Sequence, residues 1–319
     1  PQPKCFYSPM ICCPLFMRKP ASLWSPTLSP PQSSFITTMI LFSNMSIFFS
    51  MRYRFKAWRR RLQALWTAEK MMSVVTFSFF FMATGSSHSM ADEWKSGIVW
   101  PIPSVIDPGP PTTLPSPIPS DAIRLFDGKN LDAWHSGDKW LVHDGVAQVR
   151  NTDITSRESF GDCQVHLEFR TPDVVSGTGQ GRGNSGIFLM GLYELQILDS
   201  FDNETYSDGQ CGAIYKQHPP MVNACRKPGA WQSFDIHFQS PRFNPDGSVK
   251  MAAIIDVAHN GVAIHTAVQI AGTTAWDSPP QYLPHAATLP LRLQNHGNPV
   301  EFRNIWVRPL VPIVGSRPQ

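Results

Sequence analysis

Short apolar runs, separated by glycine, aspartate and asparagine, recur along the second half of the chain and set its pattern. Their length and their content of Val, Ile, Phe, Leu and Trp predict β-strands. No window keeps an apolar period of 3.6 residues over the length of a normal helix. The expected strands are 123–126, 140–143, 146–150, 164–170, 186–190, 193–198, 212–215, 232–238, 251–257, 262–266, 289–293 and 300–307.

Alternation and turn signals indicate how these strands pair. In 164–170, Val165, Leu167 and Phe169 form an apolar set that faces inward, and the residues between them face solvent or a cleft. The dipeptides at 144–145, 246–247 and 260–261, Asp-Gly, Asp-Gly and Asn-Gly, are hairpin turns because both residue types tolerate positive φ. We therefore predict an all-β protein, an antiparallel two-sheet sandwich.

Proline divides the chain. Eight prolines between residues 101 and 119 exclude a continuous helix and favour polyproline II or extended structure, so 92–120 is expected to be a tether or a wrapped arm. The globular domain is then 121–310, followed by a tail, 311–319. At 319 residues with 42% hydrophobic content, the chain has ample material for a packed core.

The segment 51–91 has the layout of a secretory signal peptide. A basic run is followed by the apolar stretch 71–82, and Ser89 and Ala91 supply a small-x-small cleavage site. The apolar stretch is too short to span a bilayer comfortably, so we expect a periplasmic or secreted protein with no stable membrane span after cleavage. We expect translation to start at Met51 or Met71, which makes 1–50 an upstream extension.

Charge indicates which partners are improbable, and cysteine spacing indicates which covalent or metal links the chain could form. The net charge is +3, and the basic residues of the leader alone exceed this surplus; no basic stripe follows residue 91, which argues against nucleic acid as a partner. Cys211 and Cys225 bracket a loop of modest length and could form a disulfide outside the cytoplasm, which would leave Cys163 as a buried free thiol. No Cys-x-x-Cys pair indicates structural zinc.

Three polar clusters interrupt the strand pattern, and we interpret them as the floor of one pocket. They are GNSG (183–186), YELQILD (193–199) and LQNHG (293–297). In the second, Glu194 and Gln196 point to one face while Leu195 and Ile197 point to the other. A carboxylate and an amide placed in this way indicate a site rather than an ordinary solvated face.

Motifs spread over the domain resemble the 3-keto-disaccharide hydrolase family. They are LFDGKNLDAW (125–134), NSGI (184–187), YELQILD (193–199), GAIY (212–215), PGAW (228–231), NGV (260–262), LQNHG (293–297) and FRNI (302–305). The resemblance implies a concanavalin A-like jelly roll that acts on oligosaccharides or glycosides oxidised at the 3 position. The family often has Glu-Trp-Asn where this chain has Ala230-Trp231-Gln232, so no site role is assigned to Gln232.

The chemistry that this substrate would need suggests roles for individual residues. A ketone at C3 acidifies the C2 hydrogen, so a base removes it, the enolate expels the C1 substituent, and water adds to the enone. Glu194 is the expected base, because its apolar neighbours raise its proton affinity. His296 is the expected proton shuttle, and Asp199 completes the catalytic set. The expected substrate-binding residues are Asn184, Gln196, Tyr215, Lys216, Gln294 and Arg303.

Other interpretations remain open at this level. A divalent metal ion could be held by Glu194, Asp199 and His296, a hard-oxygen and imidazole set. Glu194-x-Gln196-x-x-Asp199 also resembles the strand of laminarinase-like retaining glycosidases, although retaining chemistry needs two matched carboxyl groups. A lectin-like binding module is the alternative outside enzymes, with Trp134, Trp140, Trp231 and Trp276 as stacking candidates.

Overall fold

A computed structural model describes residues 92–311 and 313–315. The expected upstream extension, 1–50, and the expected signal peptide region, 51–91, lie outside the described residues, as does most of the tail. Within the described part of the chain, no helix is long and apolar enough to cross a membrane.

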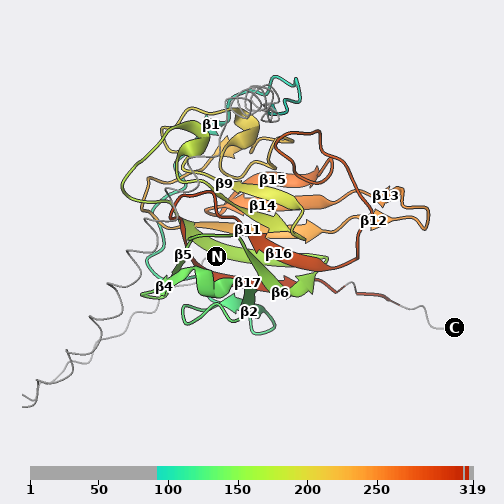
Figure 1. The fold of residues 1–319 in the computed structure, drawn as a ribbon, viewed down its shortest axis with the longest axis horizontal. Coiled ribbons are helices and arrows are strands. Elements are labelled where there is room, and N and C mark those ends of the chain that lie inside the picture. The colour runs from blue at the N-terminus through green and yellow to red at the C-terminus, as the bar shows by residue number, and fades with distance from the viewer. Residues whose placement is uncertain (1–91, 312, 316–319) are drawn as a thin grey trace, which may run out of the picture. The chain divides into compact units, whose positions relative to one another are not determined.

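Two large antiparallel sheets dominate the fold, which confirms the predicted all-β sandwich (Figure 1). Among the described residues, the larger sheet has eight strands: β15 (Val262–Gln269), β14 (Ile254–His259), β11 (Gln232–Gln239), β7 (Cys163–Arg170), β17 (Glu301–Pro309), β5 (Val146–Gln148) and β4 (Leu141–His143), with β2 (Ile123–Phe126) also paired to β17. The smaller has five: β3 (Trp134–His135), β6 (Ile154–Phe160), β16 (Leu289–Leu293), β8 (Ser185–Leu189) and β9 (Tyr193–Ile197).

Two small two-stranded sheets and three short 3-10 helices accompany the two large sheets in the described part of the chain. β1 (Ser104–Val105) pairs in parallel with β10 (Val222–Asn223), and β12 (Arg242–Phe243) pairs with β13 (Val249–Met251). Three short 3-10 helices are η1 (Gly137–Lys139), η2 (Gly179–Gly181) and η3 (Ser207–Gly209) among the described residues.

The core lies between the inner faces of the two sheets. Val165, Leu167 and Phe169 of β7 are fully buried there, as the alternation predicts. Leu195 and Ile197 of β9 reach the same core from the smaller sheet. Burial of this apolar surface is the main stabilising contribution to the sandwich.

One strand prediction needs correction, and one long strand was not predicted. Residues 212–215 form turns with isolated bridges rather than a strand, because Gly212 (φ +81°) and Lys216 (φ +62°) adopt left-handed conformations that interrupt an extended chain. The sequence analysis missed β6, whose polar residues Arg157, Glu158 and Ser159 lie together and hide its alternation.

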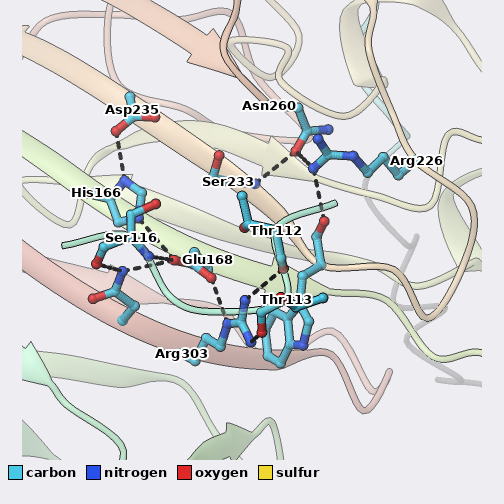
Figure 2. Close-up of polar contacts among 12 residues, drawn as sticks. Thr112, Thr113, Ser116, His166, Glu168, Arg226, Ser233, Asp235, Asn260 and Arg303 are labelled. Carbon is cyan, nitrogen blue, oxygen red and sulfur yellow. Dashed lines mark hydrogen bonds and ion pairs between the residues drawn. The ribbon is translucent and has the colours of Figure 1, made fainter. Parts of the chain in front are cut away.

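Residues 112–116 of the proline-rich segment 92–120 lie along the larger sheet (Figure 2). The Ser116 amide donates to Glu168 Oε1 (2.7 Å), and Arg303 donates to the carbonyls of Thr112 (3.3 Å) and Thr113 (3.4 Å). Arg226 donates to the carbonyls of Gly109 and Pro110. We call residues 92–120 the arm; it covers polar residues of β7 that would otherwise face water.

The cysteine prediction also needs correction. Cys163, Cys211 and Cys225 are all buried free thiols, so the disulfide between Cys211 and Cys225 is not formed in this structure. The Cys225 thiol instead donates to the Leu198 carbonyl (3.8 Å).

Candidate functional site

Strand β9 carries core residues on one face and site residues on the other. Tyr193, Leu195 and Ile197 pack into the core, so Glu194 and Gln196 project from the opposite face of the smaller sheet. The register with β8 places Phe188 opposite Glu194 and Gly186 opposite Gln196. Alternation along one strand therefore fixes both the burial of the core and the direction of the polar side chains.

A cavity of about 350 Å³ opens on this polar face. Its wall comes from strands β8, β9 and β16, from the loops around 180, 206–215 and 274–276, and from the start of the arm. The lining residues are Glu93, Gln180, Asn184, Phe188, Glu194, Gln196, Tyr206, Tyr215, Thr274, Ala275, Trp276, Arg292, Gln294 and His296. The three polar clusters of the sequence thus meet at one cavity.

Glu194 is the most perturbed carboxylate of this cavity. The residue is only 5% exposed, and among the described residues no donor hydrogen-bonds to its carboxylate. Burial raises the pKa of Glu194 to about 8; the charge of Arg292 opposes this shift, and Asp153 adds to it. A desolvated carboxyl group without a partner, facing a cavity, has the properties of a general base.

Gly186 leaves the space that the Glu194 carboxylate occupies. A Cβ atom added at Gly186 would lie 2.6 Å from Glu194 Oε1, well inside van der Waals contact. The absence of a side chain at Gly186 therefore allows the Glu194 carboxylate to lie close to the sheet, where water has little access.

Three amide oxygens on cavity-lining residues have no hydrogen-bond partner within the part of the chain that the structure describes. They are Asn184 Oδ1, Gln196 Oε1 and Gln294 Oε1. The nitrogens of the first two amides are held, because Asn184 donates to the Gln180 carbonyl (2.7 Å) and Gln196 donates to Gln180 Oε1 (2.8 Å). A buried acceptor without a donor is costly, so these oxygens favour a ligand that brings hydroxyl donors.

Arg292 is the cation of the site that the sequence analysis missed. Its guanidinium lies 3.5 Å from the Phe188 ring centroid and 2.7 Å from Asp153 Oδ2. It follows Leu291 in β16, and its side chain lies on the same polar face as Glu194. The alternation rule that identified Glu194 would also have found Arg292, had it been applied to this strand.

Two tyrosines form another part of the wall, and Lys216, which the sequence suggested as a substrate contact, lies buried behind them and does not line the cavity. The hydroxyl groups of Tyr206 and Tyr215 are 2.8 Å apart, and burial raises the pKa of both. Lys216 Nζ lies 4.3 Å from the Tyr206 ring centroid and 2.5 Å from Glu93 Oε1. Lys216 itself is buried, so its ammonium group is committed to these contacts.

His296 and Trp276 lie at the more open part of the cavity. His296 is exposed in the turn before Gly297, whose φ is +82°. Trp276 is 49% exposed, which leaves ring surface free for a ligand. Trp134 and Trp140, in contrast, are core residues whose indole nitrogens donate to backbone carbonyls.

The structure does not bring Asp199 and Arg303 to this cavity. The Asp199 carboxylate accepts from Arg182 Nε (2.7 Å) and lines a neighbouring cavity of about 570 Å³. Arg303 lies on β17 of the other sheet, 2.6 Å from Glu168 Oε2. The expected metal ligands Glu194, Asp199 and His296 are therefore not assembled together, and no cluster of three or more His, Cys, Asp or Glu suited to a metal occurs among the described residues.

Known proteins resemble this chain over most of the sandwich. A crystal structure of a protein from Parabacteroides distasonis ATCC 8503, named a "putative glycosyl hydrolase", is 43% identical with a TM-score of 0.60, covering 71% of this chain and 98% of that one. Two further structures with the same description and organism are 20% and 24% identical, each with a TM-score of 0.43 and 59% coverage of this chain, and cover 93% and 99% of theirs. No protein with a curated description matches.

The family assignment follows from a match over the sandwich itself. The model of the 3-keto-alpha-glucoside-1,2-lyase-like domain matches residues 121–308, the segment that the sequence motifs mark out. This match confirms the resemblance drawn from those motifs. The chain belongs to the 3-keto-alpha-glucoside-1,2-lyase-like domain family.

Proposed function

We propose that the protein is an exported carbohydrate-active enzyme that cleaves the glycosidic bond of 3-keto-glycosides. Family membership and the similarity to a glycosyl hydrolase structure support a carbohydrate-active role. The observation that carries the finer proposal is the Glu194 carboxylate, which is desolvated, has no hydrogen-bond partner among the described residues, and lines the same cavity as three amide oxygens that lack donors.

The reaction needs a base and no covalent nucleophile. Glu194 takes the proton from C2, and the C–H electrons form a C2=C3 double bond while the electrons of the C3 carbonyl move to its oxygen, which gives the enolate. The C1–O bond then breaks, and its electron pair leaves with the oxygen as that oxygen takes up a proton. Addition of water to the C1=C2 double bond gives net hydrolysis, whereas release of the enone would give a lyase outcome.

Other cavity residues have roles that follow from their charge and exposure. Arg292 lines the same cavity and its charge lowers the pKa of Glu194, and it would stabilise the enolate oxygen. His296 is exposed to water and would supply the proton to the leaving oxygen. Asn184, Gln196 and Gln294 would accept hydrogen bonds from sugar hydroxyls.

The alternative of a retaining glycosidase is disfavoured by the position of Asp199. That mechanism needs a second carboxylate about 5 to 5.5 Å from the first, with both facing the substrate. Asp199 instead pairs with Arg182 beside the other cavity.

One observation favours a second candidate function, a non-catalytic carbohydrate-binding module. The half-exposed ring of Trp276 and the amide oxygens would serve binding without chemistry. A binding module would not need an unpaired, desolvated carboxylate, because burying one without a partner costs stability.

The test is incubation of the purified protein with 3-keto-trehalose, with trehalose as the control that lacks the ketone. We expect glucose and a 3-keto sugar, or its enone, from the first and no product from the second. Binding of 3-keto-trehalose without any product would instead support the binding module. Signal cleavage, checked by mass spectrometry of the mature N-terminus, tests the proposed export.

The pH dependence follows from Glu194. Because its pKa is raised to about 8, the basic form is a minority at neutral pH and accumulates as the pH rises. We expect kcat/KM for 3-keto-trehalose to increase roughly tenfold per pH unit below that pKa and to level off above it. A profile that is flat from pH 6 to pH 9 would contradict Glu194 as the base.

Gly186→Ala should impair the reaction through the position of the Glu194 carboxylate. The new methyl group must displace Oε1, and a misplacement of this kind costs about 10²-fold in rate. Since the displaced atom is the end of a flexible side chain, we expect little loss of thermal stability. Gly181→Ala is the matched control, because a Cβ there meets nothing within 4 Å. Equal rates for both variants would contradict a role of Gly186 in positioning the Glu194 carboxylate.

A further inference from the structure

The start of the arm reaches the cavity, although it lies outside the family match at 121–308. The Trp94 amide donates to the Trp276 carbonyl (3.0 Å), and Lys216 Nζ donates to the Trp94 carbonyl (3.2 Å). These two bonds place Glu93 in the cavity wall with Glu194 and His296. The arm therefore contributes a second carboxylate to a site otherwise built by the sandwich.

Glu93 and Lys216 form an ion pair with unequal exposure. The Lys216 side chain is 6% exposed and the Glu93 side chain is 43% exposed. The left-handed backbone at Lys216 (φ +62°) directs the lysine into this position, and Glu93 is the carboxylate that pairs with its ammonium group. A buried ammonium group needs such a partner, which fixes the lysine and in turn orients the carboxylate.

Glu93 has hydrogen-bond acceptor positions that remain available to a ligand in the cavity. A carboxylate accepts up to about four hydrogen bonds. Lys216 donates to Oε1 of Glu93, and the Tyr206 hydroxyl group also lies against this carboxylate and lowers its pKa, so about two acceptor positions remain. An oriented carboxylate with free lone pairs is well suited to a pair of sugar hydroxyls, which are donors. Glu194 is not suited to this task in its protonated form, since it then carries a donor of its own.

We propose that Glu93 is a substrate-binding residue supplied by the arm, which accepts hydrogen bonds from hydroxyl groups of the saccharide bound in the cavity. This inference rests on the proposed function and extends it to a residue outside the sandwich. It gives the arm a role in recognition, in addition to its cover over β7.

Glu93→Gln tests the contact, with Asp92→Asn as the matched control. Asp92 precedes Glu93 in the arm and is exposed, so its substitution removes the same charge next to the site without touching the cavity. Binding of 3-keto-trehalose is measured by calorimetry in proteins that also carry Glu194→Gln, so that turnover does not consume the ligand. We expect Glu93→Gln to raise Kd at least tenfold and Asp92→Asn to change it less than twofold.

A second measurement separates direct contact from tethering. The Trp94 amide should keep its protection against hydrogen exchange in Glu93→Gln, because its bond to Trp276 does not involve the carboxylate. Affinity lost together with that protection would show that Glu93 only tethers the arm, and would overturn the proposal. Equal affinity in both variants, or tighter binding by Glu93→Gln, would overturn it as well, the latter showing that the arm competes with the ligand.

The outcomes also separate this inference from the proposed function. If the protein binds 3-keto-trehalose but forms no product, and Glu93→Gln weakens the binding, the inference stands and the proposed reaction fails. If product forms and Glu93→Gln behaves as Asp92→Asn, the reaction stands and the inference fails. Absence of any binding would end both.

Discussion

Glu194→Gln should lower kcat/KM for 3-keto-trehalose by about 10³-fold, because the amide has nearly the same shape but cannot accept the C2 proton. The affinity for the substrate should change little, since the carboxylate makes no hydrogen bond that the substitution would break within the described chain. Steady-state kinetics with calorimetric binding separates the two quantities.

The control for this substitution is Glu204→Gln on an exposed loop outside the cavity, which should keep full activity. Loss of affinity equal to the loss of rate would point to Glu194 as a binding residue and so to the binding module. Turnover within a few-fold of the wild type would remove Glu194 from the mechanism.

The same substitution should stabilise the fold at alkaline pH. The folded-state pKa of Glu194 is above its ordinary value of 4.5, so the folded protein holds the proton more tightly and stability declines as the pH rises from about 4.5 to about 8. Glutamine has no proton to lose, so the variant should lack this decline. Thermal unfolding at pH 5 and pH 8.5 measures it, and a wild-type protein with equal stability at both would contradict the burial of this carboxyl group.

Arg303→Met should cost about 3 kcal/mol of folding free energy while leaving the KM for 3-keto-trehalose unchanged. Arg303 lies 2.6 Å from the buried Glu168 carboxylate, so its removal takes away one of the two cationic groups beside that charge and leaves only His166 (Figure 2). The sequence suggested a substrate contact for Arg303, but its side chain lies on the larger sheet beneath the arm. Urea unfolding and steady-state kinetics separate the two roles.

The matched control is Arg308→Met on the same strand. Arg308 pairs with Asp121 at the surface, where both side chains are exposed by 40% or more, so its loss should cost no more than about 1 kcal/mol. Equal destabilisation by both variants would mean that the Glu168 network is no stronger than a surface pair. A raised KM in Arg303→Met alone would restore the substrate role.

Acid should reveal the same network. Burial alone would raise the pKa of Glu168, but the nearby His166 ring and hydrogen bonds from Asn304, Ser116 and Arg303 outweigh it and lower the pKa to about 2. The stabilisation is therefore complete above about pH 4.5 and is lost as the pH falls towards 2. In Arg303→Met, the loss should be smaller across this window.

Strand alternation predicted most of the fold and the centre of the site. A period of two identifies which face of β7 and β9 is core, and it predicts that Glu194 and Gln196 share a polar face. It failed where polar residues cluster, as in β6, and where a left-handed backbone follows apolar residues, as between Gly212 and Lys216.

Contacts between distant loops were beyond the sequence. Asp199 is grouped with Glu194 by its position in the chain, yet it pairs with Arg182 from a glycine-rich loop that has no period to interpret. Gln180, which holds Asn184 and Gln196 in place, comes from the same loop. Glu93 lies in a segment whose prolines indicate only an extended chain, so its arrival at the cavity depends on backbone bonds of the arm.

Strand β9 has so little freedom because each of its residues serves one of two opposite environments. Inserting or deleting one residue would exchange the two faces of the strand, so that Glu194 would point into the apolar interior and Leu195 into the cavity. Length variation among relatives should therefore be absent between 193 and 197 and accumulate in exposed loops such as the one carrying Val174 and Val175.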